Sequence, residues 1–91
     1  LPVVGLKIDR TFISTLADAS SDAAIVRSTI ELCHELGLRV CADGVPDATT
    51  LSMLAEFGCD EAQGVHLSEA VTLEGLPRRV DELEQAIRSW V

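Results

Sequence analysis

The chain has 91 residues, a formal net charge of −8 and 47% hydrophobic residues, with two Phe, one Trp and no Tyr. This length allows one small domain, whose core must be built from aliphatic side chains. The acidic balance argues against binding to a nucleic acid polymer or docking on an anionic membrane surface. In addition, no apolar run approaches the roughly 20 residues of a membrane span.

The cysteines also indicate the cellular compartment in which the protein works. Cys33, Cys41 and Cys59 form no CxxC pair, and each sits inside an apolar pattern. We therefore expect buried, reduced thiols rather than a metal site or a disulfide, in a cytoplasmic protein without a signal peptide. Because the chain begins at Leu1 rather than Met, we expect a processed or excised piece of a longer protein, or the tail of a gene whose front was lost.

The first half of the chain reads as a strand followed by a helix. An apolar run predicts a strand at 3–8, and 11–19 reads as a connector. A helix then begins near Ser20 or Ser21, both good N-cap residues, and Gly37 is expected to end it in the left-handed region. Its apolar face, which suits packing against a sheet, recurs at helical spacing. This face comprises Ile25, Thr29, Leu32 and Leu36, flanked by Val26, Ile30 and Cys33.

The second half repeats the pattern. A strand is predicted at 38–42, and the Asp-Gly pair at 43–44 is expected to turn the chain before a second helix capped by Asp47. A third strand at 60–67 and a final helix at 76–90 follow.

Strands that alternate with helices indicate an α/β fold with a parallel sheet and right-handed crossovers. Three consecutive β-α units do not close a barrel, because a full (β/α)₈ barrel needs on the order of 250 residues. The open sheet would leave two unpaired strand edges. We therefore expect self-association, by edge pairing or exchange of elements, or poor stability of the isolated chain.

Polar residues near the strand ends are the candidates for chemistry, and each has a plain structural alternative. Lys7 could stabilise a phosphate or an attacking hydroxide, or it could be a solvated strand end. Asp43, expected in register with Lys7, could bind a divalent cation or simply form an Asp-Gly turn. Gln63 could read a base or a phosphate, with Gly64 allowing close approach, or the pair could be ordinary strand residues.

The remaining polar residues point to no site. His34 is predicted to lie on the surface, and His66 has no partner at zinc-ligand spacing. Ser14, Ser52 and Ser68 lack the context of a nucleophile elbow.

Taken together, three segments resemble the EAL domain, the family of bacterial cyclic-di-GMP phosphodiesterases. Segment 6–12, LKIDRTF, is similar to the family pattern LKID-[RK]-x-F. Segment 23–40 resembles AIVxxI followed by LGLxV, and 54–64 resembles LxxxGCDxxQG. The order and spacing agree, and the likeness runs through essentially the whole chain. The resemblance implies that 1–91 is a partial EAL-like domain, the last three β-α units of a TIM-type barrel.

The resemblance also implies roles for the candidate residues. In this family, carboxylates at several strand ends hold two divalent metals, Mg²⁺ or Mn²⁺. These metals activate a water that cleaves cyclic di-GMP to pGpG. Lys7 matches the catalytic lysine, and Asp43 stands where the family has a glutamate of the metal site. Gln63 and Gly64 match the QG pair near the substrate.

The departures from the family pattern are substantial. The EAL signature, the metal-binding residues of the middle strands and the paired aspartates belong upstream of Lys7 and are not in this chain. Asp43 is one methylene shorter than glutamate, a shift of about 1.5 Å, and a misplacement of that order can cost roughly 10²-fold in rate. Pro46 replaces a second glutamate. The usual aromatic, basic residue and proline after the QG pair are replaced by Val65, Glu69 and Ala70.

These departures predict a truncated, degenerate EAL-type domain that is inactive alone, with a vestigial Lys7 and Asp43 and a regulatory or protein-interaction role. One alternative is the C-terminal part of a longer metal-dependent phosphodiesterase, and another is a non-hydrolysing cyclic-di-GMP sensor. We expect no cofactor for the isolated chain, and Mg²⁺ or Mn²⁺ only within an intact barrel. The expected partners are a second copy or another protein, with weak binding of cyclic di-GMP.

Overall fold

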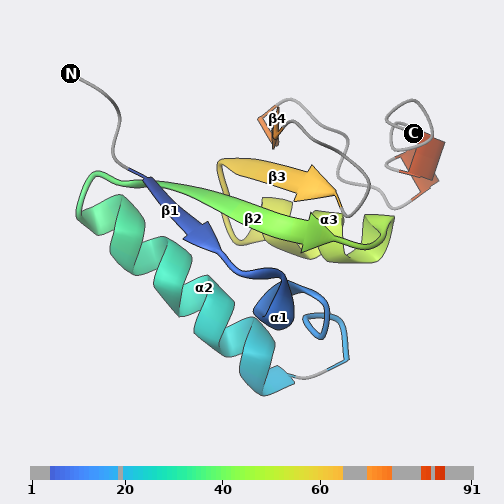
Figure 1. The fold of residues 1–91 in the computed structure, drawn as a ribbon, viewed down its shortest axis with the longest axis horizontal. Helices are drawn as coiled ribbons and strands as arrows, with labels where there is room; N and C mark the ends of the chain where they lie inside the picture. Colours follow the sequence, from blue (N-terminus) through green and yellow to red (C-terminus); the bar gives the residue numbers. More distant parts are fainter. Residues whose placement is uncertain (1–4, 19, 65–69, 75–80, 83, 86–91) are drawn as a thin grey trace.

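The computed structural model describes residues 5–18, 20–64, 70–74, 81–82 and 84–85. It shows a four-stranded sheet in the order β1-β2-β3-β4 with helices packed on it (Figure 1). The strands are β1 (Gly5–Ile8), β2 (Arg39–Val45), β3 (Glu61–Gly64) and β4 (Val71–Thr72). The helices are α1 (Arg10–Ile13), α2 (Ser20–Glu35) and α3 (Ala48–Glu56). Strands β1, β2 and β3 are parallel neighbours, which confirms the predicted α/β class.

The fourth strand was not predicted. Strand β4 pairs antiparallel with β3, through Glu61 with Thr72 and Ala62 with Val71. The backbone N–H of Leu73 also donates to the Asp60 carbonyl at 3.0 Å. This short strand covers the outer edge of β3. Within the described ranges, the sheet therefore ends at β1 and at β4, so it still has two edge strands, and the second edge belongs to β4 rather than β3.

The core lies between one face of the sheet and the helices, and aliphatic side chains dominate it. Strand residues alternate, so that every second side chain enters this core. Its fully buried residues are Ile13, Leu16, Val26, Ile30, Val40, Ala42, Leu51, Leu54 and Ala62. Burying a large aliphatic side chain contributes about 1.5–3 kcal/mol, so this cluster supplies most of the driving force for folding.

The side of α2 that faces the sheet differs from the prediction. The buried residues of this helix are Val26, Ile30 and Cys33, which had been placed on the flank of the apolar face. The stripe expected to pack against the sheet is instead exposed, with 52% of Ile25, 60% of Leu32 and 66% of Leu36 accessible. A helix with apolar residues over so wide an arc can bury only the part that meets the sheet.

Two of the predicted helix ends, at Gly37 and at Asp47, are confirmed. Gly37 has a φ of +75°, and the Leu38 N–H donates to the Cys33 carbonyl at 2.8 Å, as in a glycine C-cap. At the start of α3, the Asp47 carboxylate accepts a hydrogen bond of 2.8 Å from the Thr50 N–H. Both signals are local in sequence, so tertiary structure does not override them.

Two connections were predicted wrongly. The pair at 43–44 does not turn the chain, because β2 continues to Val45 through an irregularity at Gly44, whose φ is +71°. The segment read as a connector begins with α1, whose N-cap Asp9 accepts a hydrogen bond of 3.0 Å from the Thr11 N–H.

Some sequence predictions lie outside the described residues. These are the end of the third strand at 65–67, most of the final helix at 76–90, and the positions of His66, Ser68 and Glu69. Among the helices that the structure does describe, none is both long and apolar enough to cross a membrane.

Candidate functional site

The face of the sheet opposite the helices carries the candidate residues. Because side chains alternate along a strand, Ile8, Ala42 and Ala62 enter the core and their neighbours project from the other face. The residues of this polar face are Lys7 on β1, Arg39, Cys41 and Asp43 on β2, and Glu61 and Gln63 on β3. Three neighbouring parallel strands thus bring charged groups together on one surface.

The register places Lys7 two residues from its expected partner. Lys7 pairs with Cys41 and not with Asp43, so the prediction that Lys7 and Asp43 lie in register is wrong. Asp43 lies two residues beyond Cys41 along β2 and pairs with Gln63 on β3. Asp43 and Gln63 still lie on the same face of the sheet as Lys7, because residues two positions apart along a strand point to the same face.

Lys7 lies on the rim of a shallow hollow on this face. The hollow measures about 290 Å³ and is lined by Gly5, Leu6, Lys7, Arg39, Cys41 and Glu61. Within the described part of the chain, Lys7 makes no ion pair with a carboxylate, and its side chain is exposed. Its ammonium group is therefore available to an anion such as a phosphate.

Asp43 is held by an arginine. Arg10 Nε lies 3.5 Å from Asp43 Oδ2, and the side chain of Asp43 is only 18% exposed. Arg10 begins α1, which starts directly beyond the end of β1, so the crossover places its guanidinium over the neighbouring strand. The bulge at Gly44 makes this approach possible, because a Cβ there would lie 2.5 Å from Arg10 Cβ.

The second carboxylate of the face is also next to an arginine. Arg39 Nε lies 3.9 Å from Glu61 Oε1, across the β2–β3 pair. Each carboxylate of the polar face is thus accompanied by a guanidinium, while Lys7 adds a further positive charge. Such a surface attracts anions more readily than cations.

Gln63 and Gly64 occupy the described end of β3. Gln63 pairs with Asp43, and Gly64 pairs with Val45 beyond the irregularity in β2. Both residues are half-buried. Gln63 makes an interaction within the structure. Asp43 and Gln63 are therefore neighbours on the polar face, at the carboxyl end of the strands.

The cysteines do not supply a nucleophile or a thiolate ligand. All three are free, and Cys33 and Cys59 are buried as expected, whereas Cys41 is half-buried on the polar face. Burial, reinforced by the nearby Glu61, raises the pKa of Cys41. Burial also raises the pKa of Cys59 to about 12, and its thiol donates a hydrogen bond to the Glu61 carbonyl at 3.2 Å. Both thiols stay protonated at neutral pH.

Sequence reasoning missed an interaction at the other end of the sheet. His34 on α2 lies with its Nε2 2.8 Å from Asp60 Oδ2, and the same oxygen accepts the Val40 N–H at 2.8 Å. Partial burial acts to raise the pKa of Asp60, but the hydrogen bonds from His34 and Val40 outweigh it and lower that pKa. No local spacing links residues 26 positions apart, so the sequence predicts only that His34 is on the surface.

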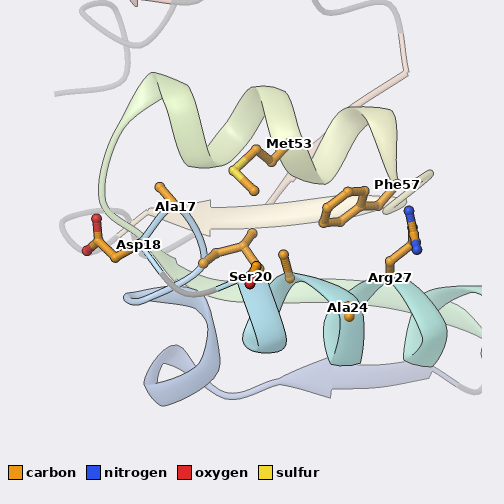
Figure 2. Close-up of a pocket in the computed structure, with 9 residues that line it drawn as sticks. Ala17, Asp18, Ser20, Ala24, Arg27, Met53 and Phe57 are labelled. Atoms are coloured by element: carbon orange, nitrogen blue, oxygen red, sulfur yellow. The ribbon is translucent and has the colours of Figure 1, made fainter.

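A further hollow lies in the helical layer. It measures about 460 Å³ and separates α2 from α3, with Ala24 and Arg27 on one side and Met53 and Phe57 on the other (Figure 2). It is separate from the polar face, because the helices cover the opposite side of the sheet.

The donor set of the described residues does not fit a pair of divalent metals. Magnesium and manganese take carboxylate and other oxygen ligands. Within those residues, no group of three or more His, Cys, Asp or Glu side chains is placed to hold a metal ion. Asp43, the carboxylate at the expected position, is already paired with Arg10.

A parallel α/β sheet with helices on one face and charged groups on the other defines part of a barrel-type α/β domain. The family model for the EAL domain matches residues 1–70. The chain belongs to the EAL domain family, whose members are TIM-barrel-like, and it covers part of such a barrel.

Individual relatives agree with this assignment. The chain is 41% identical over 76 residues to the bifunctional diguanylate cyclase/cyclic di-GMP phosphodiesterase MucR of Pseudomonas aeruginosa, a match that covers 84% of this chain and 11% of MucR. The solved phosphodiesterase of MucR in complex with c-di-GMP is 40% identical, with a TM-score of 0.67, over 85% of this chain and 31% of that one. The EAL domain of Mycobacterium smegmatis DcpA is 33% identical, with a TM-score of 0.66, over 99% of this chain and 37% of that one. The chain thus spans about a tenth of the length of the curated relatives it matches.

Proposed function

We propose that this chain, taken alone, is a degenerate EAL-type domain that does not hydrolyse cyclic di-GMP and acts through protein contacts. The observation that carries the proposed lack of hydrolysis is the charge arrangement of the polar face. Asp43 is paired with Arg10, Glu61 lies beside Arg39, and Lys7 leaves the surface with a positive charge. Two-metal hydrolysis needs carboxylates that are free to coordinate each cation.

The same face supports weak binding of a phosphate. Lys7 is exposed beside a hollow of about 290 Å³ and can approach an anionic oxygen. A single exposed ammonium gives a modest contribution, because solvent screens it. We therefore infer that cyclic di-GMP binds this chain weakly at most, with Lys7 on a phosphate and Gln63 and Gly64 nearby.

Hydrolysis and metal binding test this proposal. The purified chain is incubated with cyclic di-GMP and Mn²⁺ or Mg²⁺, and pGpG is measured by chromatography, with MucR as the positive control. We expect no pGpG above the protein-free reaction, and no heat of Mn²⁺ binding by calorimetry. Turnover that depends on added metal and disappears in Lys7→Ala would contradict the proposal.

A second candidate function is favoured by the geometry of the strands. Lys7, Asp43 and Gln63 share one face, as residues around a common barrel interior would, and the relatives are far longer than this chain. We propose that, within a longer polypeptide that supplies the remaining ligands, this segment belongs to a metal-dependent cyclic-di-GMP phosphodiesterase. Lys7 would then stabilise the attacking hydroxide, and Asp43 would be an impaired metal ligand.

The two proposed functions can be distinguished by assaying the polypeptide that the longest open reading frame containing this segment encodes. If this polypeptide hydrolyses cyclic di-GMP, Lys7→Ala is expected to lower the rate by about 10²-fold or more. Arg27→Ala, at an exposed position of α2 in the helical layer, is the matched control and should leave the rate unchanged. Equal rates for the two variants would rule out a role for Lys7.

A further inference from the structure

A groove separates helices α2 and α3. Both helices pack on the sheet, but they barely touch each other. The space between them is the hollow of about 460 Å³ in the helical layer (Figure 2). In a barrel, consecutive β-α units place their helices side by side, so no further unit packs between α2 and α3. The groove is therefore a feature of the outer surface, and not an edge at which another part of a barrel would join.

The inside of the groove is mostly apolar. Leu16, which is 1% exposed, lies at its base. Ala23 and Ala24 line the α2 wall, and Met53 and Phe57 line the α3 wall (Figure 2). Several of these side chains pack against the hydrophobic core, so the groove extends the apolar interior to the surface. The alanines are short and leave the groove wide, while the flexible side chain of Met53 can adapt to different apolar partners.

The surface around the groove is acidic. Asp18 lies at one end of the groove and Arg27 at the other (Figure 2). Glu31 lies four residues beyond Arg27 on the same face of α2, and Glu56 is exposed at the end of α3. Three carboxylates therefore lie around one guanidinium, in keeping with the net charge of −8. Such a rim attracts a cationic partner and repels an anionic one.

The walls of the groove favour a helix over an extended strand as the occupant. The backbone N–H and C=O groups of α2 and α3 are bonded within these helices, so the walls offer no row of free groups to which a strand could pair. A partner segment that buries its backbone here has to satisfy its own hydrogen bonds, and a helix does so. A third helix can also pack its side chains between the ridges of two others.

We propose that the groove between α2 and α3 is the docking site for an amphipathic helix of a partner protein, with aliphatic side chains on one side and lysine or arginine residues flanking them. The proposal rests on the protein-contact role proposed above and names its surface and the chemistry of its partner. The aliphatic side chains would cover Met53 and Phe57, and the flanking cations would face Asp18, Glu31 and Glu56. The polar face of the sheet would stay free, because the helices cover the opposite side.

A synthetic peptide serves as the probe. It has about 14 residues, or about four helical turns, with leucine at helical spacing on one side and lysine on the other. It is titrated into the 91-residue chain by calorimetry. The control peptides are a scrambled sequence of the same composition and a version with glutamate in place of lysine. We expect the leucine–lysine helix to bind, the scrambled peptide to bind at least about tenfold more weakly, and the glutamate version to give no heat.

Variants of the chain locate the surface to which the peptide binds. Ala24→Gln puts a longer side chain into the groove and should raise the Kd at least about tenfold. Ile25→Gln is the matched control, because it places the same side chain one residue on, where Ile25 lines a different hollow between β1, α1 and α2. It should leave the Kd unchanged. Replacing Glu31 and Glu56 together by glutamine should weaken binding and reduce its dependence on salt.

Several results would overturn the proposal. One is the absence of heat from the leucine–lysine peptide at millimolar concentrations. Others are equal binding of the scrambled or glutamate peptide, and equal Kd values for Ala24→Gln and Ile25→Gln. A dimer of the wild-type chain that Ala24→Gln breaks would assign the groove to a second copy instead. Circular dichroism checks that each variant folds, and Ala17→Gln, in the turn before α2, replaces Ala24→Gln if the latter unfolds.

The peptide experiment and the hydrolysis assay fail independently. Because pGpG production is measured separately, metal-dependent turnover would refute the proposed lack of hydrolysis while leaving the docking groove intact. Absence of peptide binding would refute the groove as a docking site and leave the result of the hydrolysis assay unchanged.

Discussion

Gly44 is the position where the fold and the candidate site depend on a single missing side chain. Its φ of +71° lies in the left-handed region, and a Cβ would come within 2.5 Å of Arg10 Cβ and 3.4 Å of Arg10 Cα. We predict that Gly44→Ala destabilises the chain more than a left-handed backbone alone explains. Gly37→Ala is the matched control, because Gly37 has a φ of +75° and nothing within 4 Å of its Cβ position.

The magnitudes follow from the two environments. A non-glycine residue in the left-handed region costs about 1–2 kcal/mol, and this cost applies to both variants. Forcing atoms into an occupied space adds about 1–3 kcal/mol, which applies only at Gly44. For a domain of this size, 1 kcal/mol shifts the melting temperature by about 4–8 °C. Gly44→Ala should therefore melt roughly 10 °C below Gly37→Ala.

Thermal unfolding followed by circular dichroism gives these values, and a double-mutant cycle identifies the cause. Arg10→Gly removes the Cβ that would collide, so its combination with Gly44→Ala should recover about 1 kcal/mol or more relative to additivity. Equal melting temperatures for Gly44→Ala and Gly37→Ala would refute the reasoning. An additive cycle would show that the cost of Gly44→Ala does not come from Arg10.

Three further predictions concern stability. The hydrogen bonds to Asp60 lower its pKa in the folded chain from the ordinary value of 3.8. On acidification, Asp60 is therefore protonated in the unfolded chain at a higher pH than in the folded chain. Asp60 therefore adds stability above pH 3.8 that is lost as the pH falls through the folded pKa, and Asp60→Asn should flatten this part of the urea-unfolding pH profile. Asp47→Ala removes the hydrogen bond of 2.8 Å from the Thr50 N–H, so it should lower the free energy of unfolding, measured by urea titration, by about 1 kcal/mol. Asp47→Asn should keep most of the wild-type stability, because asparagine can accept the same hydrogen bond. Leu51→Ala, at a fully buried site of α3, should cost about 2–5 kcal/mol in the same titration, and a value below 1 kcal/mol would contradict the assigned core.

The success of sequence reasoning depended on how local each signal was. Gly37 and Asp47 were predicted correctly because their caps involve residues within five positions along the chain. At Gly44 the same logic failed, because an Asp-Gly pair is typical of a turn. Here the strand continues because β3 provides a partner, Gly64, for the residue beyond the bulge. Pairing between distant segments therefore overrode the local preference.

The exposed stripe of α2 shows a second limit. Helical spacing identified two adjacent apolar stripes, but periodicity alone does not say which one meets the sheet. Ile30 is completely buried, whereas Leu32, two residues on, is 60% exposed. The choice is made by the crossover, which fixes the rotation of α2 about its axis relative to β1 and β2.

The polar face shows how a site can keep its framework and change its charge balance. The sequence placed Lys7, Asp43 and Gln63 on three strands, and the parallel sheet brings them to one surface. It did not predict that Arg10, from the next element after β1, reaches Asp43 at 3.5 Å. The bulge at Gly44 leaves just enough room for Arg10, so the local backbone and the ion pair depend on each other. A cation that binds at Asp43 would have to compete with the neighbouring Arg10 guanidinium, which is a reason for weaker metal binding that composition alone does not reveal.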